Sequence, residues 1–207
     1  KEALKTIPSY DEEIKRLYGF AQPEGRGESL MERINLPSLN IRGLESAWVG
    51  PQARTVVPAE ATAAIDIRMV KGNDPDDMVN KVIEHVKREG FHVISENPDQ
   101  NTRMQYADIV KIVKRGGYPA SRTSMDLGIS QLTIEALSDY HDEQVVLVPT
   151  SGGSVPLYIF TQMLDVPTIN VPIVNHDNNQ HQPNENIRIG HYWKGIETLA
   201  ALLVYVK

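Results

Sequence analysis

Alternating apolar and polar positions predict two strands in the first half of the chain. Within residues 38–44, Leu39 and Ile41 lie on one face and polar side chains lie on the other. Residues 61–70 show the same alternation, with an apolar side chain at every second position. A period of two is typical of half-buried strands, because successive side chains point to opposite faces. We therefore expect a half-buried strand in each range.

A helix and a third strand are predicted directly after these two strands. Between residues 75 and 89, apolar side chains recur at helical spacing and form one stripe, namely Met78, Val79, Val82, Ile83 and Val86. Asp74 followed by Pro75 favours the beginning of a helix, and Gly90 suits its end. Residues 91–96 form the next predicted strand. The order strand, strand, helix, strand with short connections predicts a two-layer α+β unit.

The second half of the chain has longer apolar runs between helical segments. We predict helices at residues 129–140 and 155–164, strands at 144–148 and 167–173, and a terminal helix from about Gly190, whose inward face consists of Ile196, Leu199, Ala200, Leu203 and Val206. Strands that are apolar on both faces and alternate with helices are typical of a parallel sheet covered by helices. This half is therefore predicted to have an α/β architecture.

Two stretches carry weaker patterns. Residues 1–36 are charged and loosely patterned, with one short helix predicted at 11–18. Residues 97–123 contain two adjacent glycines and a proline, and we interpret them as a linker with one short helix around 106–113. We predict two domains, consisting of residues 1–105 and 106–207.

Composition excludes several classes of protein. The 207 residues carry 21 basic and 27 acidic side chains, and a formal net charge of −6 argues against a nucleic-acid-binding domain with a strongly basic surface. No apolar run approaches the roughly 18 residues of a membrane span. The sequence contains no cysteine, which excludes disulfides, thiolate metal sites and a cysteine nucleophile. The chain begins at Lys1 without a Met, so we expect a processed product or a piece of a longer protein.

Two segments after predicted strands carry candidate chemistry, because open α/β sheets bind ligands beyond the carboxyl ends of their strands. The first, residues 149–154, is a glycine-rich turn before a predicted helix. Exposed N–H groups, the helix dipole and the Ser154 hydroxyl would favour a carboxylate or phosphate. The alternative is a tight turn with a serine cap. The turn lacks the Lys-Ser/Thr ending of a P-loop and the Gly-x-Ser-x-Gly of a nucleophile elbow.

The second segment, residues 175–186, holds two His, one Asp and one Glu among many Asn and Gln side chains. An imidazole of His176 or His181 can bind zinc. The alternative is a solvated loop whose His and Asn residues stabilise turns. A catalytic zinc site needs about three protein ligands and a base. The sequence offers at most two ligands here and no second cluster of His and carboxylates.

Five motifs, in their order along the chain, resemble the M20 metallopeptidases. They are Ser38-Leu-Asn-Ile-Arg-Gly-Leu44, Arg54-Thr-Val-Val-Pro-Ala-Glu-Ala61, Ala64-Ile-Asp-Ile-Arg-Met-Val70, Ser151-Gly-Gly-Ser-Val-Pro156 and His181-Gln-Pro-Asn-Glu185. The most similar subgroup is the carnosinase and cytosolic non-specific dipeptidase type. The resemblance implies an α/β protein with a partial two-layer α+β lid (dimerisation) domain, followed by the C-terminal α-β-α-β-α part of a parallel-sheet zinc-peptidase domain.

The resemblance also implies an activity. M20 enzymes hydrolyse dipeptides or related amides with two divalent metal ions, zinc or manganese, and His181 corresponds to their last metal ligand. Their other ligands and the general base, a Glu, belong to an N-terminal segment with no counterpart here. We therefore expect this chain to be the C-terminal portion of such a hydrolase and to be inactive alone. The family further implies a short peptide or amino-acid-derived substrate, a homodimer formed through the lid and a cytoplasmic location, with a secreted or periplasmic location left open.

The resemblance gives catalytic roles to two residues of the lid. Arg68 would bind the substrate carboxylate, a task that suits a planar, bidentate guanidinium. Its alternative is a surface arginine on a strand. Thr55 corresponds to a threonine that contacts the substrate bound in the partner subunit. Its alternative is a residue chosen for strand propensity.

The resemblance gives supporting roles to residues of the second half. Gly153 and Ser154 resemble a turn that binds the substrate carboxylate, in agreement with the prediction for that segment. Asn184 and Glu185 would orient the loop of His181 without binding the metal themselves.

Two other functions stay open. One is a non-catalytic dimerisation module with an amino-acid carboxylate site at the Gly-Ser turn. The other is an acyl-amino-acid or carbamoyl amidohydrolase of the same family. A His-x-Asp motif and a Glu-Glu pair encoded upstream of Lys1 would distinguish a catalytic protein from the non-catalytic module.

Overall fold

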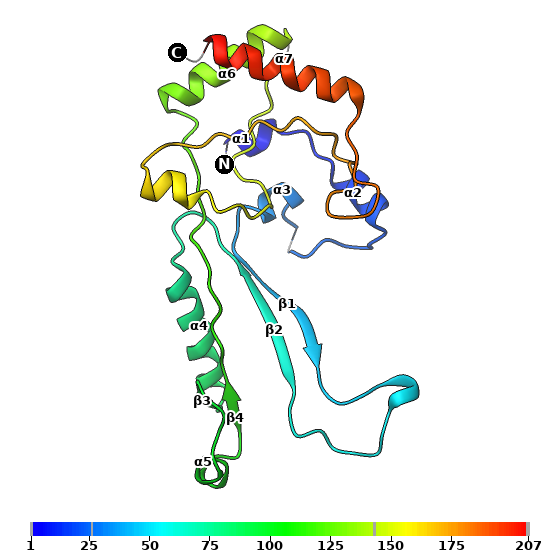
Figure 1. Cartoon of the computed structure of the whole chain (residues 1–207), viewed down its shortest axis with the longest axis vertical. Coiled ribbons are helices and arrows are strands. Elements are labelled where there is room, and N and C mark those ends of the chain that lie inside the picture. The colour runs from blue at the N-terminus through cyan, green and yellow to red at the C-terminus, as the bar shows by residue number, and fades with distance from the viewer. Residues whose placement is uncertain (1, 26, 143, 206–207) are drawn as a thin grey trace. The chain divides into compact units, whose positions relative to one another are not determined.

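The computed structural model describes residues 2–25, 27–142 and 144–205. The chain forms two compact units (Figure 1). The middle unit is Ile34–Ser121, and the terminal unit combines Lys1–Arg33 with Arg122–Lys207. The domain boundary predicted between residues 105 and 106 stays a prediction.

The middle unit begins with the predicted antiparallel pair of strands. β1 (Ser38–Glu45) and β2 (Thr62–Arg68) pair with Ser38 opposite Arg68, and a bulge follows Ile41. Both strands form as predicted, but they are not half-buried, since most of their residues are exposed. Leu39 and Ile41 are 49% and 63% exposed, because alternation predicts which side chains share a face and does not supply a layer that covers it.

The helix α4 (Pro75–Arg88) agrees closely with its prediction. Asp74 is the N-cap, and its Oδ1 accepts hydrogen bonds from the backbone N–H groups of Asp76 (2.8 Å) and Asp77 (3.0 Å). Beyond the helix, Gly90 has φ of +96°, a conformation that glycine adopts without a steric penalty. Local signals therefore determine both ends of α4.

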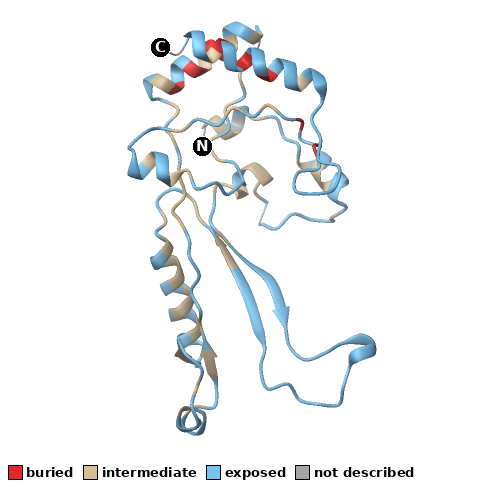
Figure 2. Cartoon of the chain, viewed as in Figure 1, coloured by how far each residue is buried: buried red, intermediate tan, exposed pale blue. Residues whose placement is uncertain are grey.

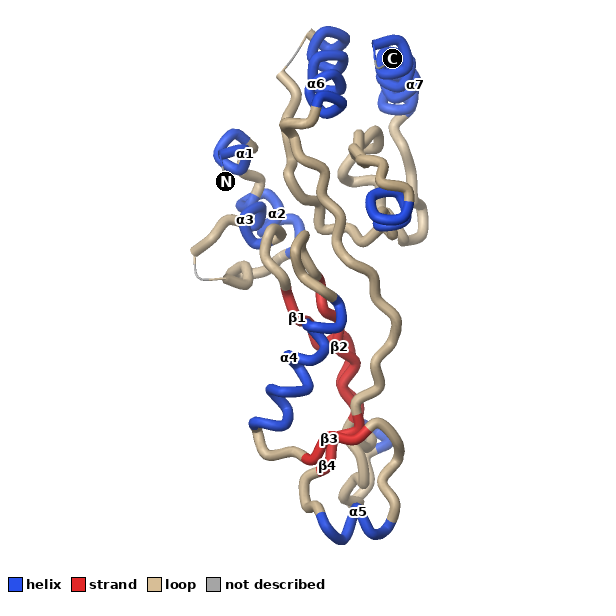
Figure 3. Tube along the Cα trace, turned by 90° about the vertical axis from the view of Figure 1, so that its left-hand side faces the viewer, coloured by secondary structure: helices blue, strands red, loops and turns tan. Residues whose placement is uncertain are grey.

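A parallel pair of short strands completes the middle unit. β3 (His92–Ile94), which contacts α4, pairs with β4 (Ile109–Lys111), and α5 (Gln100–Gln105) lies between them in sequence (Figure 3). The helix predicted around residues 106–113 is wrong. These residues include β4, because they pair with β3, and the local pattern of residues 106–113 does not reveal that pairing.

The terminal unit is mainly helical among the described residues. It contains α1 (Glu2–Thr6), α2 (Asp11–Tyr18), α3 (Leu30–Arg33), α6 (Gly128–His141), the π-helical segment η2 (Ile159–Met163) and α7 (Ile189–Tyr205). α2, α6 and α7 confirm three of the four helices predicted there. The part of the chain that the structure describes has no helix with the length and apolar character needed to cross a bilayer.

α6 and α7 contact each other, and most of their buried side chains are small. The buried residues are Ser130, Thr133, Ala136 and Leu137 on α6, and Gly195, Thr198 and Ala201 on α7 (Figure 2). At the edge of this contact, the Tyr140 hydroxyl donates to Glu197 at 2.6 Å. Short side chains on both helices allow their backbones to approach closely.

The inward face predicted for α7 is therefore wrong. Ile196 and Leu203 are 44% and 79% exposed, and Leu199 and Ala200 are exposed as well. Val206 lies outside the described residues. The apolar stripe is the most hydrophobic face of the helix, but the buried face is the one with the small residues Gly195, Thr198 and Ala201.

Three elements predicted for the terminal unit do not form in the described residues. The segments 144–148 and 167–173 are not strands, and η2 replaces the α-helix predicted at 155–164. A strand needs a neighbouring strand to pair its N–H and C=O groups. Within the second segment, a side chain pairs the backbone in place of a neighbouring strand. The Thr123 hydroxyl donates to the Thr168 carbonyl (2.6 Å) and accepts from the Thr168 N–H (3.0 Å).

Candidate functional site

A polar loop of the terminal unit, residues 175–188, carries His181 and is closed by its own side chains. Asn175 Oδ1 accepts a hydrogen bond from the backbone N–H of Arg188 at 3.1 Å, and Asn175 Nδ2 donates to Asp177 Oδ1 at 2.8 Å. The guanidinium of Arg188 also pairs with the Asp177 carboxylate. Asn175 is only 3% exposed. We call Asn175, Asp177 and Arg188 the loop clip.

A second set of hydrogen bonds shapes the interior of the loop. The buried Asn178 accepts from the N–H of Asn186 (2.9 Å) through its carbonyl and from the N–H of Gln180 (3.1 Å) through its side chain. Asn179 Nδ2 donates to the Pro183 carbonyl at 2.5 Å. These bonds pair backbone groups that neither helix nor sheet satisfies here. The amide-rich composition of the segment therefore serves the loop itself.

Three residues of the loop have a left-handed backbone. They are Asn179, His181 and Asn184, with φ of 59°, 63° and 65°. Asn and His are enriched in this conformation among residues other than glycine. His181 is exposed, so the loop presents its imidazole to solvent while the amides bind the backbone.

The Asp177 carboxylate is stabilised by both other members of the clip. The hydrogen bond from Asn175 lowers the pKa of Asp177 most, and the nearby charge of Arg188 lowers it further. Both interactions favour the ionised carboxylate. Asp177 is therefore ionised at neutral pH, as its pairing with Arg188 requires.

His181 fits the role of one metal ligand, because an exposed imidazole can coordinate zinc. Across residues 2–25, 27–142 and 144–205, no three His, Asp or Glu side chains gather closely enough to hold a metal ion. A two-metal centre needs more donors than this part of the chain brings together. The metal-binding role of His181 stays a prediction.

Gly153 and Ser154 lie in an exposed stretch of the terminal unit. A Cβ added at Gly153 would meet no atom within 4 Å, so its backbone is open to solvent. The helix expected to begin after this turn is absent, and η2 has only five residues. The dipole argument for an anion at this turn is therefore wrong, and the roles of Gly153 and Ser154 rest on the resemblance alone.

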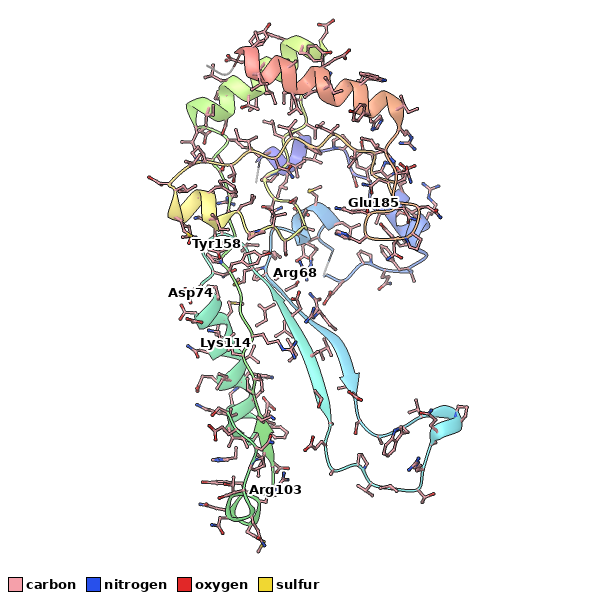
Figure 4. The ribbon with its side chains drawn as sticks, viewed as in Figure 1. Arg68, Asp74, Arg103, Lys114, Tyr158 and Glu185 are labelled. Carbon is pink, nitrogen blue, oxygen red and sulfur yellow. The ribbon has the colours of Figure 1, made fainter. Side chains whose placement is uncertain are left out.

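Arg68 lies at the end of β2 in the middle unit (Figure 4). Its Nε donates to Asp66 Oδ2 at 2.6 Å. Residues two apart on a strand share a face, which brings this guanidinium and carboxylate together. Arg68 therefore already binds a carboxylate of its own strand, which is the chemistry predicted for it with a substrate.

Thr55 is exposed in the loop that joins β1 to β2, after the 3₁₀ helix η1 (Gly50–Gln52). The guanidinium of Arg54 lies over the ring of Trp48, 5.1 Å from its centroid, a cation–π contact. Val57 of the same loop is 91% exposed. The loop thus presents apolar and hydroxyl groups to solvent.

The predicted site residues fall into both units. Thr55 and Arg68 belong to the middle unit, and Gly153, Ser154, His181, Asn184 and Glu185 belong to the terminal unit. Asn184 contributes its carbonyl, which accepts from Asn186 Nδ2 at 3.0 Å, and Glu185 is exposed. The orienting roles of Asn184 and Glu185 stay predictions.

The sequence prediction missed the loop clip. The density of Asn side chains was a signal that the loop is hydrogen-bonded internally. The pairing of Asn175 with Arg188 spans 13 positions and has no local signature.

Comparison with known proteins connects these observations. Residues 2–93 match the domain described as the peptidase dimerisation domain of M20 enzymes. This part of the chain is therefore similar to an M20 peptidase dimerisation domain. The match includes residues before 38, for which the hydrophobic pattern predicted little. The resemblance of the lid motifs to M20 metallopeptidases is thereby confirmed.

Two curated relatives of this chain have the names of dipeptidases. The Cys-Gly metallodipeptidase DUG1 of Candida albicans is 27% identical over 184 residues, which cover 88% of this chain and 35% of the relative. The Beta-Ala-His dipeptidase of Mus musculus is 23% identical over 178 residues, which cover 86% of this chain and 34% of the relative. The chain thus spans about a third of the length of these relatives.

A solved structure shows the same fold. The M20 family metallo-carboxypeptidase Sso-CP2 from Sulfolobus solfataricus superposes with a TM-score of 0.79 at 24% identity, over 99% of this chain and 44% of that chain. The predicted fold class, a partial α/β metallopeptidase architecture, is confirmed by this likeness, although the individual strands predicted for the terminal unit are not formed.

Proposed function

We propose that the complete gene product is a metal-dependent hydrolase of dipeptides or short peptides, to which this chain contributes the lid and part of the active site. One observation carries the proposal. A chain similar to an M20 dimerisation domain over residues 2–93 also holds an exposed imidazole, His181, on an internally braced loop. The names of the relatives, metallodipeptidase and dipeptidase, support the same class of substrate.

His181 would supply one imidazole ligand to a zinc or manganese ion. When bound, such a metal activates water and polarises the scissile carbonyl. The further ligands and the general base would come from a segment upstream of Lys1, and this chain alone would therefore be inactive. We keep the cytoplasm as the expected location, which fractionation of the host cells would test.

Arg68 would bind the terminal carboxylate of the substrate. Its guanidinium already holds Asp66 at 2.6 Å, and a substrate carboxylate would use the same charge-assisted geometry. Gly153 and Ser154, both exposed, would offer a second carboxylate contact, as the resemblance implies. Carboxylate recognition of this kind would favour short peptides over internal bonds of proteins.

The M20 dimerisation domain would join two copies of the protein, and Thr55 would contact the substrate of the partner subunit. The exposed apolar and hydroxyl groups of its loop support this role. Light scattering of the complete gene product should give the mass of a dimer. Thr55→Ala should lower turnover without dissociating the dimer, and a monomer with full turnover would contradict the role of Thr55.

A metal-replacement assay tests the proposed hydrolase. The complete gene product is freed of metal with a chelator and assayed on dipeptides before and after addition of Zn²⁺ or Mn²⁺. Activity should depend on the metal, His181→Ala should abolish it, and the matched variant His176→Ala, also exposed in the loop, should retain it.

Three other results would change the conclusion. Full activity of His181→Ala would contradict the proposal. Hydrolysis of acyl-amino acids or carbamoyl compounds in place of dipeptides would assign the related amidohydrolase function. Dimerisation without any hydrolysis would assign the non-catalytic module. The 207-residue chain, assayed alone with the same metals, should be inactive.

A further inference from the structure

The side chain of Asn175 uses all of its hydrogen-bonding groups within the loop. Oδ1 accepts from the N–H of Arg188, while Nδ2 donates to Asp177 (2.8 Å) and to Asn186 Oδ1 (3.4 Å). At 3% exposure, Asn175 cannot exchange these partners for water. Removal of its amide would leave polar groups unpaired in a buried place.

These bonds join the two ends of the loop that carries His181. Arg188 lies 13 positions after Asn175, and His181 lies about midway between them. The bond between Asn186 and Asn178 closes the loop a second time, nearer to His181. Without the clip, the segment around His181 would gain conformational freedom, and ordering it again would cost entropy.

An asparagine suits position 175 because two of its partners, Arg188 and Asp177, need opposite groups. The N–H of Arg188 needs an acceptor, and the Asp177 carboxylate needs a donor. Aspartate would offer only acceptors and would place a second carboxylate 2.8 Å from Asp177. Arg188 then completes the clip, since its backbone binds Asn175 and its side chain binds Asp177.

We propose that Asn175 is a positioning residue that acts with Asp177 and Arg188 to hold His181 where it can bind the metal. This inference rests on the proposed metal-dependent function. Groups that orient metal ligands typically contribute about 10–100-fold to metal affinity. We expect a loss in that range when the Asn175 amide is removed.

Zinc titration of the complete gene product tests this role. Zn²⁺ affinity is measured against a competing chelator for the wild type, Asn175→Ala and Gln180→Ala, a control that removes an exposed amide from the same loop. Amide hydrogen exchange of residues 176–187 is measured without metal. Asn175→Ala should weaken Zn²⁺ binding about 10–100-fold and speed exchange in the loop, while Gln180→Ala stays near wild type.

Two further readouts separate positioning from general stability. Excess Zn²⁺ should restore kcat in Asn175→Ala, which a collapsed structure would not allow. Arg188 is half exposed, so substitutions there are compatible with folding. Arg188→Met should weaken Zn²⁺ binding, and Arg188→Lys, which keeps a cation beside Asp177, should recover most of it.

Equal Zn²⁺ affinity in the wild type and Asn175→Ala would overturn the positioning role, and so would equal losses in Asn175→Ala and Gln180→Ala. Failure of the proposed function would look different. The wild type and His181→Ala would then bind Zn²⁺ equally, whatever the exchange rates of the loop.

Discussion

Gly195 of α7 lies directly against Ile173. A Cβ at position 195 would stand 2.3 Å from Cγ2 of Ile173, far inside the distance that two carbon atoms tolerate. Ile173 comes just before the His181 loop, and α7 begins just after it. The contact therefore holds together the two segments between which the loop clip closes.

Gly195→Ala should destabilise the terminal unit by about 1–3 kcal/mol, the usual cost of forcing atoms into a packed place. Urea unfolding of the variant measures this cost. Gly190→Ala is the matched control on the same helix, since its Cβ would meet no atom within 4 Å. Unchanged unfolding of Gly195→Ala would contradict the contact. In the double variant of Gly195→Ala with Ile173→Ala, the loss of Cγ2 from position 173 should relieve part of the clash.

Asp74→Ala should destabilise α4 by about 1 kcal/mol, since it removes the acceptor for the N–H groups of Asp76 and Asp77. Asp74→Ser keeps a capping oxygen and should destabilise α4 by only about a few tenths of a kcal/mol. Thermal unfolding of the two variants gives the comparison. Equal melting temperatures for the two variants would show that the cap contributes nothing.

Arg68→Ala in the complete gene product should lower kcat/KM for dipeptides by orders of magnitude, because the substrate carboxylate would lose its charged partner. Arg68→Lys keeps the charge without the planar fork and should restore only part of the activity. Arg42→Ala, which removes an exposed arginine from β1, is the control and should have little effect. Steady-state kinetics on peptides of several lengths measure this effect. An unchanged kcat/KM in Arg68→Ala would contradict the role of Arg68 in binding the substrate carboxylate.

Asp177→Asn should change the acid stability of the His181 loop. Because folding lowers the pKa of Asp177 below its ordinary value of 3.8, its stabilising contribution is complete above that value. The contribution is lost as the pH falls through the lowered pKa, when the carboxylate takes up a proton. The protection of the loop amides from hydrogen exchange, taken relative to the intrinsic rate at each pH, should therefore fall with acid in the wild type. In Asp177→Asn this protection should already be low near neutral pH and change less with pH, and parallel protection curves for both proteins would contradict this.

Elements with local signals were predictable from the sequence. The dipeptide Asp74-Pro75 and Gly90 place the ends of α4, because capping and left-handed conformations involve only neighbouring residues. The alternation in β1 and β2 predicts both strands, and the motif at His181 identified the loop later found to be braced.

Elements that depend on distant partners were not predictable in the same way. Residues 109–111 become a strand because β3 lies beside them, and residues 167–173 do not, because no strand of the described chain pairs with them. The buried face of α7 is the one with Gly195, Thr198 and Ala201, where close approach outweighs hydrophobicity.

The sequence by itself determined the local elements, the absence of thiol chemistry and the kinship with M20 dimerisation domains. Only the tertiary structure decided how His181 is held. The clip depends on Asn175 and Arg188 meeting across the loop and on the burial of one amide between a donor and an acceptor. Asn175 and Arg188 are 13 positions apart and meet only when the loop closes. A short stretch of neighbouring residues therefore cannot reveal their pairing.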